Sequence, residues 1–191
     1  MTTLSDYIIR KNVPLNENPA LSVFRGKVGI VQGWISIVLN LFLFGIKLFF
    51  GVASNSIALI ADSIHTLSDM ASSAVVLFGF RMASKPADKE HPFGHGRAET
   101  IAALTIAILI GFTGIEFIKS SLARFMEDIM INVNWAVIAV IILTIFLKEG
   151  LARLSLNLGD TINSDILKAD ALHHRSDMYS SVLVLAAFGG V

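Results

Sequence analysis

The sequence carries the same pair of potential metal ligands twice, a histidine followed four residues later by an aspartate. The pairs are His65 with Asp69 and His173 with Asp177. Residues four positions apart share one face of an α-helix, so each pair can present an imidazole nitrogen and a carboxylate oxygen to a common ion. Two imidazoles and two carboxylates suit tetrahedral Zn²⁺, with Mn²⁺, Fe²⁺, Co²⁺ and Cd²⁺ as alternatives.

The two pairs belong to a longer internal repeat. Residues 61–77 read ADSIHTLSDMASSAVVL and residues 169–185 read ADALHHRSDMYSSVLVL, which are identical at ten of seventeen positions without a gap. A single histidine or aspartate in an apolar helix is often explained by hydrogen bonding between helices. Duplication of the whole motif favours a metal site over that explanation.

Each copy also has an aspartate three residues before its histidine, Asp62 in the first and Asp170 in the second. At this spacing the carboxylate can accept the second ring N–H of the histidine and orient it as an outer ligand, or line a water-filled path to the ion. A carboxylate stabilised by the dipole at a helix N-terminus explains the same positions equally well. Both interpretations stay open.

A third group of potential ligands lies in residues 85–97, KPADKEHPFGHGR. Asp88, His91 and His95 stand in a segment whose prolines and glycines predict a turn, so they could form an exposed three-ligand metal site. Solvated histidines without a ligand are the ordinary alternative when spacing is the only argument.

The composition places these residues in a membrane. Of 191 residues 54% are hydrophobic and 16% charged, and the mean hydropathy is +0.69, which excludes a disordered chain and argues against an ordinary soluble domain. The net charge of zero gives no reason to expect a nucleic-acid surface. The lack of cysteine excludes disulfides, thiolate metal sites and cysteine nucleophiles.

The apolar residues form five stretches, each close to the roughly 20 residues that a helix needs to cross a bilayer. We therefore expect an all-α membrane protein, a bundle of five transmembrane helices in residues 27–191, preceded by a cytoplasmic arm, residues 1–26, that lacks the features of a signal peptide. The expected helices cover residues 28–53, 57–83, 98–123, 134–158 and 165–190. The connections between them are too short for a separate soluble domain.

The basic residues predict an orientation, because cytoplasmic loops are enriched in lysine and arginine. On the side of the membrane opposite the N-terminal arm, the basic residues are only Lys119 and Arg124. The larger set lies at or near the ends of the arm, of the second-to-third connection and of the fourth-to-fifth connection: Arg10, Lys11, Arg25, Lys27, Arg81, Lys85, Lys89, Arg97, Lys148, Arg153 and Lys168. The N-terminus is therefore expected in the cytoplasm.

The two copies of the repeat fall on the second and fifth expected helices, which run in opposite directions and so form an inverted pseudo-repeat. In each helix the ligands lie 8 and 12 residues after the expected start, or roughly 12 to 18 Å along the axis. That depth is near the middle of the bilayer from either side. The sequence thus predicts one shared site between two antiparallel helices.

Three segments, ADSIHTLSD, KPADKEHPFGHGRAE and ADALHHRSD, resemble motifs of the cation diffusion facilitator family of divalent-metal transporters. The resemblance extends from about residue 26 to the C-terminus. It implies that the four repeat ligands form the transport site and that Asp88, His91 and His95 form a second metal site in the loop. It also implies a homodimer in a bacterial-type plasma membrane that exports metal in exchange for protons and needs no bound cofactor.

Family members usually have six spans followed by a cytoplasmic metal-binding domain, so we expect this chain to be truncated before the sixth helix. A non-transporting membrane scaffold that binds metal is therefore a second hypothesis. A membrane metallohydrolase is disfavoured, because the sequence has neither an H-E-x-x-H motif nor a nucleophile motif. We expect a secondary transporter and not an enzyme.

Overall fold

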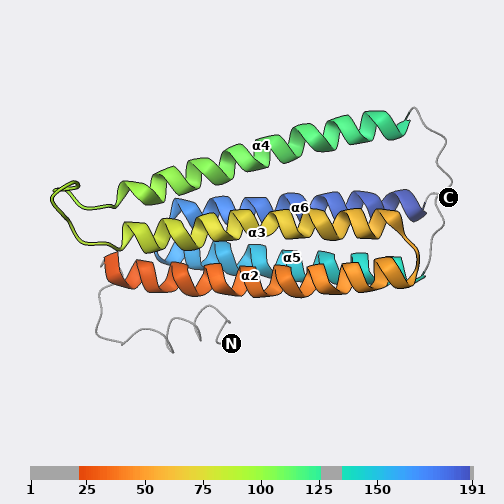
Figure 1. Ribbon diagram of the computed structural model, residues 1–191, viewed down its shortest axis with the longest axis horizontal. Helices are drawn as coiled ribbons and strands as arrows, with labels where there is room; N and C mark the ends of the chain where they lie inside the picture. The colour runs from red at the N-terminus through yellow and green to blue at the C-terminus, as the bar shows by residue number, and fades with distance from the viewer. Residues whose placement is uncertain (1–21, 126–134, 190–191) are drawn as a thin grey trace.

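The structure, a computed structural model, describes residues 22–125 and 135–189. This part of the chain is helical apart from its turns and one loop, which confirms the expected all-α class. Five helices run side by side (Figure 1). Their bounds are α2 Ser22–Ala53, α3 Ile57–Ala83, α4 Arg97–Phe125, α5 Trp135–Thr161 and α6 Asp165–Gly189.

The first helix begins earlier than the sequence suggested. Residues 22–26, which we expected in the arm, belong to α2. Phe24 and Val28 are one helical turn apart and both lie in the hydrophobic core beside Phe80, so packing stabilises a turn that the polar composition of the arm concealed. Residues 1–21 of the expected arm lie outside the described residues.

Each helix runs antiparallel to the one before it, and α2, α3, α5 and α6 lie together while α4 lies along one side (Figure 1). We call the end at which residues 84–96 connect α3 to α4 the loop end, and the end with the turn Ser54–Ser56 the far end. From the loop end, α4 diverges from the other helices toward the far end (Figure 1). As expected from the inverted repeat, α3 and α6 are antiparallel neighbours.

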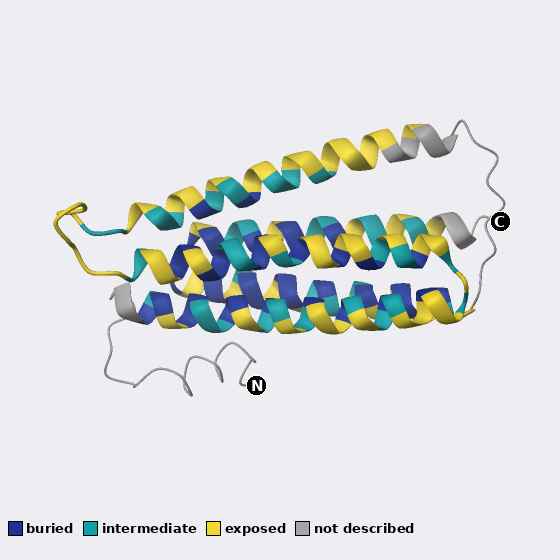
Figure 2. Ribbon diagram, viewed as in Figure 1, coloured by how far each residue is buried: buried dark blue, intermediate teal, exposed yellow. Residues whose placement is uncertain are grey.

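Three of the five helices are long and apolar enough to cross a membrane. These spans are Phe24–Ala53 in α2, Arg97–Lys119 in α4 and Trp135–Thr161 in α5. The expected five spans are thus supported in three helices of the described chain. The two others, α3 and α6, have 27 and 25 residues, and they carry the charged residues of the repeat, which lower their hydropathy. Much of α4 is exposed (Figure 2). Its exposed residues include large apolar ones such as Ile101, Leu104 and Ile108, as in a lipid-facing helix.

Buried side chains form three layers along the bundle. An apolar cluster at the loop end includes Val76, Phe80 and Leu158, and a smaller one at the far end includes Leu59 and Val140. Most of the buried polar side chains of α2, α3, α5 and α6 lie between these clusters, and the set is Gln32, Ser36, Asn40, Lys47, Thr66, Asp69, Ser73, Thr144, Lys148, Ser155, Asp170, His173, His174 and Asp177. We call this middle set the polar layer. It coincides with the depth that the repeat predicted for its ligands.

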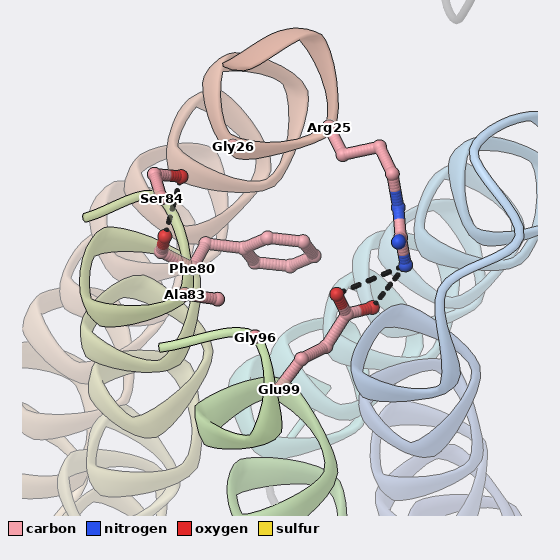
Figure 3. A pocket seen from close by; sticks show the side chains of 7 residues that line it. All are labelled: Arg25, Gly26, Phe80, Ala83, Ser84, Gly96 and Glu99. Atoms are coloured by element: carbon pink, nitrogen blue, oxygen red, sulfur yellow. Dashed lines mark hydrogen bonds and ion pairs between the residues drawn. The ribbon is translucent and has the colours of Figure 1, made fainter. Parts of the chain in front are cut away.

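Polar contacts also join the helices at the loop end (Figure 3). The guanidinium of Arg25 donates to both carboxylate oxygens of Glu99, at 2.7 and 2.9 Å, and to the carbonyl of Asn163 at 3.1 Å. Ser164 donates to the same carboxylate at 2.6 Å. These four residues, which we call the clasp, connect α2, α4 and the turn between α5 and α6.

Candidate metal centre

The antiparallel packing of α3 and α6 brings the two histidine–aspartate pairs into one part of the polar layer. His65, Asp69 and Asp177 each offer a ligand atom within 4.8 Å of those of the other two. The fourth residue, His173, places Nε2 at 3.8 Å from Asp69 Oδ1 and 3.7 Å from Asp177 Oδ2. All four residues predicted from the sequence therefore lie together.

The distances between these ligand atoms are close to those of a filled site. A tetrahedral ion bound at about 2.0 to 2.2 Å holds its ligand atoms roughly 3.4 Å apart, so small movements of the side chains would close the set. His173 Nε2 and Asp177 Oδ1 are buried and have no hydrogen-bond partner within the described chain. Because an unpaired buried polar atom is unfavourable, these two atoms favour a bound cation.

A cavity of about 280 Å³ reaches the ligands from the side of α4. Its walls include His65, Asp69 and His173, together with Thr113 and Glu116 of α4. His65 is 45% exposed whereas the side chains of the other three ligands are at most 6% exposed, so His65 is the most exposed of the ligands on the cavity wall. An ion entering between α3 and α4 would meet it first.

One residue of this centre was not expected from the sequence. Lys148 of α5 places Nζ at 2.8 Å from Asp69 Oδ2 and 2.6 Å from Asp177 Oδ2, and its side chain is 1% exposed. We expected it near the cytoplasmic end of its helix, but α5 continues to Thr161, so Lys148 lies thirteen residues from either end of Trp135–Thr161. A lysine in the middle of an apolar span was the signal that could have identified it.

The two preceding aspartates do not hydrogen-bond to the ligand histidines in the described structure. Asp62 pairs with Lys47 at 2.9 Å. Asp170 lies 3.3 Å from Nε2 of His174, the residue four positions later in α6. It also accepts from Ser155 at 2.8 Å and from Gln32 at 3.3 Å.

The loop residues also come together. Asp88, His91 and His95 offer ligand atoms within 4.8 Å of one another, near the loop end. The imidazole nitrogens of both histidines lie 3.5 Å from Asp88. The backbone N–H groups of His91 and Glu90 donate to Asp88 Oδ1 at 2.7 and 3.0 Å. The bond from His91, with smaller effects from the nearby imidazoles, holds the pKa of the Asp88 carboxyl below its usual value of 3.8.

These features define a class: a helical membrane protein with a buried centre of histidine and aspartate between two antiparallel helices. The family model described as the cation efflux transmembrane domain matches residues 33–191. The chain belongs to this family of cation efflux transporters, which are not enzymes.

Three relatives illustrate the similarity. The chain is 44% identical over 151 residues to the uncharacterized transporter MJ0449 of Methanocaldococcus jannaschii, covering 79% of this chain and 53% of the relative. It is 37% identical over 155 residues to metal tolerance protein C1 of Arabidopsis thaliana, covering 73% and 33%. It is 34% identical over 157 residues to the manganese efflux system protein MneP of Bacillus subtilis, covering 82% and 52%. The chain therefore spans about half or less of the length of these relatives.

Proposed function

We propose that the chain is the membrane domain of a proton-coupled exporter of divalent metal ions, with Zn²⁺ as the cargo. In this proposal His65, Asp69, His173 and Asp177 hold the ion in transit. The observation that carries the proposal is the meeting of the two repeat copies in one polar layer between two apolar clusters. A divalent cation would offset the charge of two carboxylates held at this depth.

Proton coupling follows from the chemistry of the ligands. Metal binding requires neutral imidazoles and ionised carboxylates, so loading the site releases protons and protonation expels the ion. On the cytoplasmic side, where protons are scarcer, the site captures metal. On the more acidic outer side it takes up protons and releases metal.

The inverted pair of α3 and α6 supports transport by alternating access, in which one group of helices rocks against another around a fixed site. The cavity beside α4 supplies one route to the ligands. We further propose that the N-terminus is cytoplasmic, that the membrane is a bacterial-type plasma membrane, and that the complete protein is a homodimer. In this topology Asp88, His91 and His95 form a second metal site on the cytoplasmic face.

The test is transport by the purified chain in liposomes that contain a zinc indicator and a pH dye. We expect zinc uptake with an opposing proton flux, and we expect Asp69→Ala and Asp177→Ala to abolish both, because each removes a charged ligand from the centre. Asp160→Ala is the matched control, since Asp160 is an exposed aspartate near the end of α5. Wild-type rates in both ligand variants would disprove the site, and zinc uptake without proton movement would disprove the coupling.

The same assay separates the alternatives for cargo and for function. Two imidazoles favour Zn²⁺ over Mn²⁺, which prefers oxygen ligands, but the similarity to a manganese efflux protein makes Mn²⁺ the second candidate. Competition of Mn²⁺, Fe²⁺, Co²⁺ and Cd²⁺ with zinc uptake would rank them. Stoichiometric binding without turnover would instead identify a metal-binding scaffold.

A further inference from the structure

The centre already contains a positive charge that belongs to the protein. The ammonium of Lys148 donates hydrogen bonds to one oxygen of Asp69 and to one oxygen of Asp177. These carboxylates come from α3 and α6, and the lysine comes from α5, so the ammonium bridges the two halves of the inverted repeat. Its position between both carboxylates is the position that a metal ion needs.

The groups around the ammonium explain why it lies there. It contacts Asp69 on α3 and Asp177 on α6, and these carboxylates lie 3.8 Å from the imidazole of His65 and 3.7 Å from that of His173. Two carboxylates buried at this depth are strongly unfavourable without a nearby positive charge, and removal of one partner from such a group leaves an uncompensated charge. The second buried lysine, Lys47, is occupied by Asp62 and Thr66, so Lys148 is the cation that reaches both carboxylates in the described chain.

We propose that Lys148 is the resident counter-cation of the transport site, which compensates one of the two negative charges of Asp69 and Asp177 when no metal is bound and which the arriving ion must displace. This inference rests on the proposed transport site. It assigns to a residue outside the four ligands a direct part in setting how tightly the site holds its cargo.

Two consequences follow from the covalent tether of the ammonium. The tether keeps the ammonium beside the carboxylates at an effective concentration on the order of mM or more. A monovalent cation from solution that replaced it would bring no additional positive charge to the site. A divalent ion brings one positive charge more than the ammonium and also binds the imidazoles, so the site favours it over the lysine. The return of the ammonium then helps to expel the ion, so the lysine lowers affinity for the cargo while it promotes release.

The ammonium of Lys148 can move away from the metal position and still remain in the polar layer. Lysine has four flexible methylene groups, and Asp177 retains a second oxygen, Oδ1, that is buried and without a partner in the described chain. An ammonium that shifts toward this oxygen would free Asp69 and Oδ2 of Asp177 for the metal. A positive charge would then remain beside the carboxylates throughout the exchange.

The experiment compares Lys148→Gln and Lys148→Arg with the wild-type chain, with Arg153→Gln as the matched control. Arg153 is also a cation of α5, but its side chain is 71% exposed and pairs with Glu149. For each purified chain, the dissociation constant of Zn²⁺ is measured by calorimetry, and the melting temperature is measured with and without Zn²⁺. The change in melting temperature on adding Zn²⁺ detects charge compensation. If the lysine had only a structural role, its replacement would not alter this change.

We expect Lys148→Gln to melt at a lower temperature than the wild type without metal and to bind Zn²⁺ about tenfold more tightly, a change of about 1.4 kcal/mol. Its melting temperature should also rise more on adding Zn²⁺, because the metal becomes the only counter-charge. Lys148→Arg should keep the low affinity of the wild type, and Arg153→Gln should change neither quantity.

A second variant covers the case in which Lys148→Gln does not fold. The double variant Lys148→Gln with Asp69→Asn removes a negative charge together with the positive one, and we expect it to fold without metal. Its failure to fold would show that the lysine is required for packing and would overturn the proposal.

The remaining outcomes separate this inference from the proposed function. Zinc binding that requires Asp69 and Asp177 but is unchanged in Lys148→Gln would disprove the role of the lysine and leave the transport site standing. Zinc binding that does not depend on either aspartate would disprove the transport site itself.

Discussion

At the scale of single residues, each aspartate of the inverted repeat has a nitrogen partner in the structure. Asp69 and Asp177 share Lys148, whereas Asp62 pairs with Lys47 and Asp170 pairs with His174. The repeat places the acids at equivalent positions, but their partners come from different helices and differ in type. The symmetry of the acids is therefore broken by the residues that neutralise them, and the two halves of the site are chemically distinct.

Asp88 in the loop leads to a prediction about pH. Its lowered pKa means that the folded loop binds a proton less readily than an unfolded chain, so the stabilisation by this carboxylate is present above pH 3.8 and is lost as the pH falls through the lowered pKa. With metal removed by a chelator, the NMR chemical shift of the Asp88 carboxyl carbon should report a midpoint below 3.8. A free peptide of residues 85–97 should titrate near the ordinary value, about 3.9. Equal midpoints in the protein and the peptide would contradict the effect of the backbone N–H donors.

At the scale of the helices, the site depends on how closely α4 and α6 approach α3 at the loop end. A Cβ atom built on Gly79 would lie 2.6 Å from the Cβ of Ala102 and 2.9 Å from Cδ1 of Ile166. These contacts leave no room for a methyl group, so glycine at this position allows three helices to meet. Farther along the bundle α4 diverges (Figure 1), and the cavity reaches the ligands there.

The close approach predicts opposite effects of two similar substitutions. Gly79→Ala should lower the free energy of unfolding by about 1 to 3 kcal/mol, because the added methyl group forces the helices apart. Gly111→Ala on α4 should instead be neutral or stabilise by up to about 1 kcal/mol, because a Cβ there meets nothing within 4 Å and alanine favours the helix. Unfolding of both variants in detergent, followed by circular dichroism, measures the difference. A stabilising Gly79→Ala would show that the helices are not in contact.

At the scale of the whole molecule, the helices and the meeting of the two ligand pairs could be predicted, because apolar stretches and an inverted repeat are properties of the sequence itself. The expected bounds of α3 and the start of α6 agree with the structure. The partners of the ligands could not be predicted. They depend on the rotation of each helix about its axis, which places Lys148 against the two carboxylates and Asp170 against His174. The early start of α2 likewise depends on packing across the bundle, where Phe24 joins the apolar cluster that includes Phe80.

The architecture as a whole predicts which part of the bundle admits water. At the loop end, the apolar cluster and the clasp leave a pocket of only about 80 Å³, lined by Arg25, Phe80 and Glu99 (Figure 3). The larger cavity, of about 280 Å³, opens between α3 and α4 in the middle of the bundle. Single cysteines can report this difference cleanly, because the chain has no cysteine of its own. Thr113→Cys would lie in the cavity wall, and Ala102→Cys would lie eleven residues earlier on the same helix at a position that is 5% exposed.

A water-soluble thiol reagent should therefore modify Thr113→Cys about ten times faster than Ala102→Cys, whose reaction requires local opening of the packed loop end. Zn²⁺ should slow the reaction of Thr113→Cys, because an ion held by His65 and Asp69 would share its cavity. Adding Glu99→Gln to Ala102→Cys should increase the rate, since the charged hydrogen bonds from Arg25 are lost. Adding Glu149→Gln, which removes an acid from an ion pair elsewhere, should leave it unchanged. Equal rates at the two cysteines would mean that the loop end is as open as the cavity, and the clasp would then have no part in closing it.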